Sequence, residues 1–135
     1  MATYNVGYDK TYKAGMDLTD YQYHFVKFNS SGMIINASTL GASVVGVLQN
    51  DPKSASEPAV VRVYGFSRIR LDTEDAASPI VIGQWVRAAS SGRATGLELL
   101  NFAASDCSPG WVNETLATGS GLWAEIFICP QRFGV

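Results

Sequence analysis

The stretch Ala59-Val60-Val61-Arg62-Val63-Tyr64-Gly65 carries the clearest structural signal in this sequence. It is rich in β-branched residues, and its odd-numbered positions would share one face of an extended chain. Beyond the glycine the alternation resumes in Phe66-Ser67-Arg68-Ile69-Arg70-Leu71, where two arginines alternate with two aliphatic residues. The pattern predicts a strand with one buried face and one face in water.

Similar short segments recur along the chain at a spacing of about ten residues, separated by Gly, Pro and Asn. We predict further strands at Tyr21–Phe28, Met33–Ile35, Ser43–Leu48, Ile80–Val86 and Leu122–Cys129. The turn residues Asn29-Ser30-Ser31-Gly32 predict a hairpin between the first two of these. Turns are also expected at Ser90–Arg93 and Ser108–Gly110, whereas the run at 97–103 is interpreted as irregular. Pro52 and Pro130 are expected to end strands. The fold class is therefore all-β, as a small β-barrel or sandwich.

The first twenty residues differ from this pattern. Tyr4, Val6 and Tyr8 would share one face of an extended segment, and Tyr12 follows. We interpret residues 1–20 as an extended N-terminal arm that binds another subunit, and residues 21–135 as the β-rich domain. The alternative is that these tyrosines fold back over the domain's own core.

Composition excludes several classes of protein. Charged residues make up only 16% of the chain and the net charge is -2, with lysines and arginines scattered rather than clustered. Direct nucleic-acid binding is therefore not expected. No apolar stretch approaches the roughly 20 residues that span a bilayer, and the start Met1-Ala2-Thr3-Tyr4-Asn5 lacks the features of a signal peptide. We expect a protein that is made in the cytoplasm and does not enter membranes.

Candidate catalytic and metal-binding groups are sparse. His24 is the only histidine, which leaves little for a Ser-His-Asp arrangement or a His-rich metal site. Cys107 and Cys129 lack metal-ligand spacing and are expected to be reduced thiols. Asp17, Asp20 and Glu74-Asp75 look like residues of solvated turns. The sequence predicts no cofactor, no metal and no enzymatic activity.

Three segments in order resemble the capsid cement, or head decoration, proteins of tailed bacteriophages. They are Val44–Pro52, Ala59–Gly65, and Gly83-Gln84-Trp85-Val86 followed by Ala88–Gly92. The resemblance covers the region from about Tyr23 to Gly96. The chain departs from the pattern in having Gln84 where an aspartate is common and in lacking a glycine within Pro52–Glu57.

The resemblance implies a β-tulip-like or small-barrel core, assembled as a homotrimer on the outer face of an icosahedral head. The partner would be the major capsid protein, and the role would be structural stabilisation of capsomer contacts. Such a protein would be part of the virion. Tyr4, Val6, Tyr8 and Tyr12 are then the candidate capsid-binding residues.

Two other functions are compatible with the residues. A carbohydrate-binding or host-attachment module would use exposed aromatics such as Trp85, Trp111 and Trp123 to stack on sugar rings. In strands that alternate with aliphatic residues, core or inter-subunit packing is the favoured role for Trp85 and Trp123. A small β-barrel hydrolase would need a general base that the sequence does not visibly offer.

Overall fold

The computed structural model describes residues 7–39, 42–72, 82–89, 91–96, 107–112 and 123–132, and its strands join into one antiparallel sheet. The strand order is β3-β2-β4-β5-β9-β8-β6-β7, and β1 also pairs with β5. Within the described ranges there is no helix, so the all-β prediction is confirmed. The strands are β1 (Gly7–Lys13), β2 (Phe25–Phe28), β3 (Ile34–Asn36), β4 (Gly46–Leu48), β5 (Pro58–Arg70), β6 (Trp85–Ala88), β7 (Ala94–Gly96), β8 (Cys107–Val112) and β9 (Trp123–Arg132).

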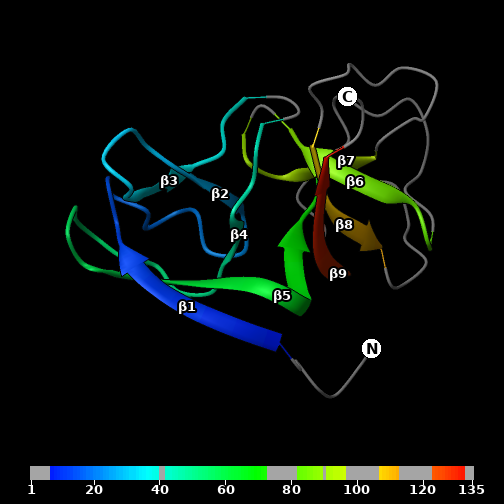
Figure 1. Cartoon of the computed structure of the whole chain (residues 1–135), viewed down its shortest axis with the longest axis horizontal. Helices are drawn as coiled ribbons and strands as arrows, with labels where there is room; N and C mark the ends of the chain where they lie inside the picture. Colours follow the sequence, from blue (N-terminus) through cyan, green and yellow to red (C-terminus); the bar gives the residue numbers. More distant parts are fainter. Residues whose placement is uncertain are drawn as a thin grey trace.

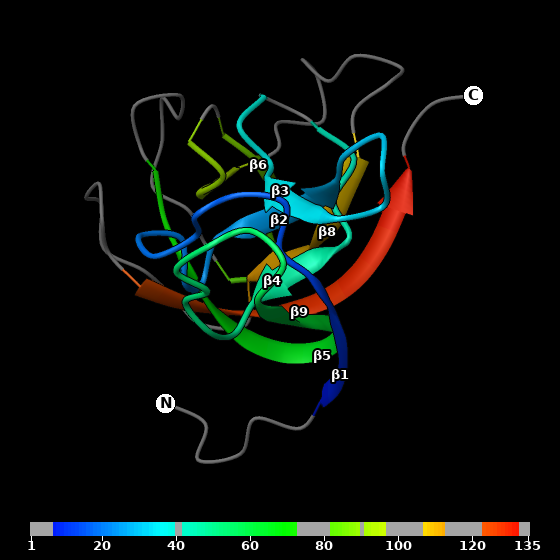
Figure 2. The same cartoon turned by 90° about the vertical axis from the view of Figure 1, so that its left-hand side faces the viewer.

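The longest strand, β5, organises the sheet. The two predicted alternating segments join in one strand of 13 residues that bends sharply in its middle (Figure 1). Gly65 lies in the middle of this strand with a φ of 105°, a backbone conformation that residues with a Cβ rarely adopt. The first half of β5 pairs with β1 and β4, and the second half pairs with β9. Figure 2 shows β9 as a long curved strand beside β5.

Two core clusters follow from the bend in β5. One lies between the second half of β5 and strands β2, β4, β6, β7, β8 and β9, and contains Phe25, Ile69, Ile126 and Ile128. The other lies at the first half of β5 with β2, β3 and β4, and contains Leu18, Ile34 and Val61. Of the predicted inward positions, Ala59, Val61 and Ile69 of β5 and Leu71 just after it are buried, whereas Val63 is half-buried. Arg62, predicted on the wet face, is also buried.

The predicted hairpin is present, together with a second one. Strands β2 and β3 pair through Val26 and Asn36, and the Asn29 side chain accepts bonds from the Ser31 and Met33 amides, which closes the turn. Strands β6 and β7 pair with each other where the sequence predicted only a turn, and the Gly92 amide donates to the Ala89 carbonyl there. Both turns end on a glycine with positive φ, as their geometry requires.

The strand predicted at Tyr21–Phe28 is shorter in the structure. Residues 21–24 form a turn, and β2 begins only at Phe25. Tyr23 has a φ of 61°, which extended backbone does not allow. The alternation of aromatic residues misled the prediction because Tyr21 and Tyr23 pack against different core clusters, one on each side of the turn.

Two prolines behave differently from expectation. Pro130 was expected to end its strand, but β9 continues to Arg132, and Ser108-Pro109-Gly110 lies inside β8 rather than in a turn. The ladder between β8 and β9 is irregular between Ser108 and Gly110. A proline costs no ladder hydrogen bond at such an irregularity, which explains how both residues fit within paired strands.

The N-terminal segment belongs to the sheet from residue 7 onward. Strand β1 pairs with β5 from Gly7↔Gly65 to Lys13↔Pro58, and Ala14 and Leu18 are fully buried in the second core cluster. The sequence predicted an extended segment here. The described residues of the segment are extended, and they pair with β5 of their own domain. A boundary at residue 20 would therefore divide a core cluster, and residues 1–6 lie outside the described part of the chain.

Candidate functional site

The predicted capsid-binding residues fall in different environments. Tyr4 and Val6 lie outside the described residues. Tyr8 on β1 is 63% exposed and pairs with Tyr64 on β5, itself 54% exposed. Tyr12 is half-buried, with its ring edge-on to Phe28 at a centroid distance of 5.1 Å, and it packs on the second core cluster. Of the two predicted binding residues that the structure describes, Tyr8 is the exposed one.

A larger aromatic surface lies on the sheet face opposite the first core cluster. Phe66, Phe127, Trp111 and Trp85 are directly opposite one another on β5, β9, β8 and β6. Directly paired residues of an antiparallel sheet share a face. Ile126 and Ile128, which flank Phe127, belong to the core. We call Phe66, Phe127, Trp111, Trp85 and the adjoining Tyr64 the aromatic row.

The rings of the aromatic row contact one another in sequence. Centroid distances are 5.4 Å for Tyr64 to Phe127, 5.0 Å for Phe66 to Phe127, 4.7 Å for Phe127 to Trp111 and 5.1 Å for Trp111 to Trp85. All but the Trp111–Phe127 pair meet edge to face, a favoured geometry that holds the rings rigidly. Apart from the exposed Tyr64, the side chains of the row are half-buried.

The aromatic row has the composition of a protein-binding surface. Tyrosine, tryptophan and phenylalanine are enriched at the buried centres of protein interfaces, where they supply contact area at a low cost in conformational entropy. Sequence reasoning identified Trp111 as a candidate for such contacts but missed the row. Trp85, Trp111 and Phe127 each stand beside a core aliphatic residue in their strand, as Trp85 stands before Val86. This local pattern does not show which strands pair with one another, so the aromatic row could not be predicted from it.

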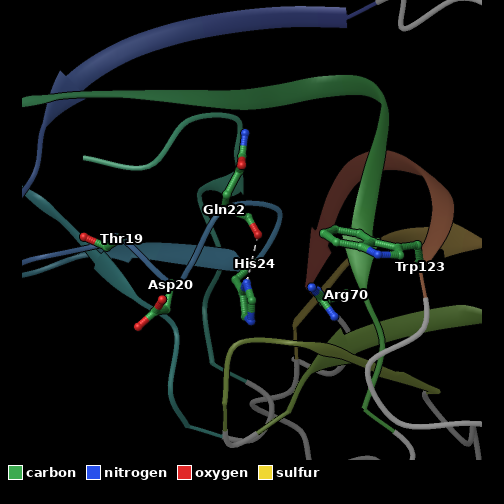
Figure 3. A pocket seen from close by; sticks show the side chains of 6 residues that line it. All are labelled: Thr19, Asp20, Gln22, His24, Arg70 and Trp123. Atoms are coloured by element: carbon green, nitrogen blue, oxygen red, sulfur yellow. Dashed lines mark hydrogen bonds between the residues drawn. The ribbon is translucent and has the colours of Figure 1, made fainter. Parts of the chain in front are cut away.

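A second candidate site is an open, mostly polar cleft of about 280 Å³ between the turn at residues 19–24 and the paired ends of β5 and β9. Figure 3 shows the side chains that line it: Thr19, Asp20, Gln22, His24, Arg70 and Trp123. Backbone bonds hold the turn in place, since Tyr23 donates to the Leu48 carbonyl and accepts from the Arg70 amide. The strained Tyr23 backbone thus joins the turn to both halves of the sheet.

His24 is the most buried of the lining residues. It is 6% exposed, and its Nδ1 lies 3.1 Å from the carbonyl oxygen of Gln22. The dashed line in Figure 3 marks this hydrogen bond. Burial lowers the pKa of its imidazole below the usual 6.5, and the positive charges of Arg93 and Arg70 lower it further. The imidazole is therefore neutral at pH 7. With Nδ1–H donated to the carbonyl, Nε2 acts as an acceptor.

Trp123 forms the aromatic wall of the cleft. It pairs with Arg70 across β5 and β9, and the guanidinium carbon lies 4.1 Å from the indole centroid. The Tyr23 ring meets the indole edge to face at 5.4 Å. Trp123 is 39% exposed and belongs to neither core cluster, so the predicted core role is wrong for it and inter-subunit packing stays a prediction.

Other predicted features can be placed briefly. Cys129 is a free, half-buried thiol, and the side chain of Cys107 lies outside the described set. Glu74-Asp75 also falls outside it. In the ranges given above, no group of three or more His, Cys, Asp or Glu side chains could hold a metal ion. No helix of the described residues is long and apolar enough to cross a membrane.

Comparisons with known proteins give a likeness in fold. No protein family and no curated protein matches the sequence. Among solved structures, the chain is similar to the N base of the head fiber protein gp8.5 of bacteriophage phi29. The two share 13% sequence identity with a TM-score of 0.59, over 92% of this chain and 95% of that one. At this identity the likeness establishes a shared β-fold over nearly the whole length of both chains.

Proposed function

We propose that this protein is a structural component of a bacteriophage head, and more specifically a cement protein on the outer face of the capsid. The observation that carries the proposal is the likeness in fold, along nearly the entire chain, to the base of a phage head fiber. The ordered segments that resemble decoration proteins support the same class of function independently. Such a protein stabilises the assembled shell by binding it and not its separated subunits.

The aromatic row and the adjacent Tyr8 are the proposed contact surface for the major capsid protein. Tyr8 and Tyr64 are exposed neighbours, and the ring contacts continue from Tyr64 across the sheet to Trp85. This assignment keeps Tyr8 from the predicted arm and replaces Tyr12, whose ring is engaged with Phe28. Tyr4 and Val6 remain candidates in the segment before β1.

We propose a role without catalytic turnover, because His24 is the only histidine of the sequence. Its Nδ1 is engaged by a main-chain carbonyl and not by the carboxylate of a Ser-His-Asp arrangement. We therefore expect no turnover of generic ester and glycoside substrates by the purified protein. Hydrolysis of any of them above a heat-denatured control would contradict this part of the proposal.

The central test is co-sedimentation of the purified protein with expanded and unexpanded phage shells. We expect saturable binding to the expanded shell, and a loss of occupancy when Tyr8 and Tyr64 are both changed to Ala. Truncating a buried interface tyrosine commonly costs on the order of 2 kcal/mol, so the double variant should lose affinity by at least tenfold. Several chains acting together on one lattice would amplify the loss.

The matched control is Phe28→Ala, which removes an exposed aromatic residue at 44% exposure from β2, away from the aromatic row. It should bind shells like the wild type while melting at a similar or slightly lower temperature. If neither shell is bound by the wild type, the cement proposal is wrong. If the tyrosine variant folds and binds normally, the contact lies elsewhere on the protein.

A further inference from the structure

We propose that the cleft between the turn at residues 19–24 and the ends of β5 and β9 binds a neutral sugar residue. This inference goes beyond head binding and does not depend on it, because the cleft residues are distinct from the aromatic row. Its volume of about 280 Å³ is at the lower limit of small-molecule sites, which fits one sugar ring rather than a long oligosaccharide.

Trp123 supplies the aromatic platform. The faces of a pyranose ring carry apolar C–H groups that pack well on the electron-rich face of an indole. Arg70 covers one face of this indole at 4.1 Å and Tyr23 contacts it edge to face, so the ring is already held before a ligand arrives. Little conformational freedom is lost on binding, which is the main benefit of a preorganised site.

The polar lining matches sugar hydroxyl groups, which both donate and accept hydrogen bonds. The exposed carboxylate of Asp20 and the neutral imidazole of His24 are acceptors, and the guanidinium of Arg70 is a donor. Two lining side chains are fixed from outside the cleft: the Gln22 amide nitrogen donates to the Gln49 carbonyl, and the Thr19 hydroxyl donates to Asp17. The walls are thereby held in place.

Charge favours a neutral ligand over an anionic one. The lining has one carboxylate, on Asp20, and one guanidinium, on Arg70, and the His24 imidazole is neutral; Arg93, whose charge also reaches His24, is not among the lining residues. A phosphate or an acidic sugar would gain the attraction of Arg70 but meet the repulsion of Asp20. A neutral sugar meets no such penalty and can bond to both groups.

The test uses the full-length protein without shells and titrates it with methyl glycosides of glucose, galactose, rhamnose and N-acetylglucosamine. Binding is followed by tryptophan fluorescence and by saturation-transfer NMR. We expect at least one neutral glycoside to bind with a Kd in roughly the millimolar range or tighter. Sodium glucuronate and inorganic phosphate should bind at least about tenfold more weakly, since they meet the Asp20 carboxylate.

Two variants locate the site. Trp123→Ala should reduce affinity for the bound glycoside by about tenfold or more, and Asp20→Asn should reduce it less while leaving the fold intact, because Asp20 is exposed. The matched control is Phe28→Ala, an exposed aromatic outside the cleft, which should bind the glycoside normally. Melting temperatures confirm that each variant is folded.

Three results would overturn the proposal: binding of none of the neutral glycosides, tighter binding of glucuronate or phosphate than of any neutral sugar, or unchanged affinity in both Trp123→Ala and Asp20→Asn. Since the assay contains no shells, its failure leaves the cement function standing. Failure of shell binding, in turn, does not affect the sugar titration.

Discussion

Asp9 and Arg62 join β1 to the bend of β5. The Arg62 guanidinium binds both carboxylate oxygens of Asp9, at 2.7 and 3.1 Å, and a third bond reaches the Phe66 carbonyl beyond Gly65. The Arg62 side chain is 11% exposed and that of Asp9 is 35% exposed, so the pair is partly shielded from water. Arg62 thus binds the edge strand β1 and also links the two sides of the bend in β5.

We expect Asp9→Ala to lower the free energy of unfolding by about 1–2 kcal/mol. This loss lies between the losses typical of breaking an exposed ion pair and a buried one. The Arg62 guanidinium is mostly buried, and removal of the Asp9 carboxylate takes away one of its partners. Urea denaturation of the variant and of the wild type measures the difference. As a control, Asp51→Ala removes an exposed carboxylate and should change stability little. Equal midpoints for Asp9→Ala and wild type would contradict this prediction.

His24 predicts that stability decreases as the pH falls through and below about 6.5. Its folded-state pKa lies below the usual 6.5, so the unfolded chain binds the proton more readily than the folded one. The stability is therefore fully present above pH 6.5 and falls as the pH decreases through that value. One proton limits the slope to about 1.4 kcal/mol per pH unit.

The measurement is urea denaturation at several pH values for the wild type and for His24→Gln. Since His24 is the only histidine, the variant should lose most of the slope in this range. Asp17 and Glu57 have pKa values lowered by hydrogen bonds from Thr19 and Lys53, and they act only below about pH 4.5. An unchanged slope in His24→Gln would show that another group titrates on unfolding.

At the scale of elements, β1 is an edge strand that belongs to the domain. In the part of the chain that the structure describes, it pairs with β5 on one side and with no strand on the other. Lys10 and Lys13 lie along this edge, and charged side chains of this kind discourage unwanted strand pairing. Ala14 and Leu18 then continue from β1 into the core.

Two deletions test whether the N-terminal residues form a separate arm or part of the folded core. Deletion of residues 1–6 should leave a cooperative thermal transition near that of the wild type. Deletion of residues 1–20 should lower stability by about 3 kcal/mol or more, because it removes β1 and the fully buried Leu18. Thermal and urea unfolding measure both variants. A stable domain that begins at Tyr21 would instead support the boundary predicted from the sequence.

At the scale of the molecule, exposed aromatic residues and a free strand edge favour self-association. Tyr8, Tyr64, Phe28 and Trp123 are each at least 39% exposed. Covering such surface and edges stabilises closed symmetric oligomers. We propose a homotrimer, in agreement with the family that the sequence resembles.

Light scattering of the purified protein should give a mass about three times that of the 14.5 kDa chain. The same measurement on the Tyr8→Ala, Tyr64→Ala double variant shows whether these residues serve the oligomer or the shell. A monomer at micromolar concentration would contradict a trimer in solution. It would leave open only assembly on the shell, which co-sedimentation of the monomer would detect.

The sequence by itself determined the fold class, most strand positions, one hairpin and a turn that proved to belong to a second. These features depend on local chemistry: alternation decides which face of β5 is buried, and the Asn29 side chain accepts the amide bonds that close its turn. Gly92 fits its turn because few other residues adopt its backbone conformation. The same local logic failed at Tyr23 and Pro130. There, packing on two separate clusters and an irregular ladder override the pattern of the segment.

Only the tertiary structure decided where the candidate sites lie. The aromatic row exists because β6, β8, β9 and β5 pair in an order that no segment encodes alone, which aligns Trp85, Trp111, Phe127 and Phe66. The polar cleft likewise brings His24 to Arg70 and Trp123 across long stretches of chain. Pairing between distant strands is set by the global balance of burial and chain entropy, so it cannot be read from neighbouring residues.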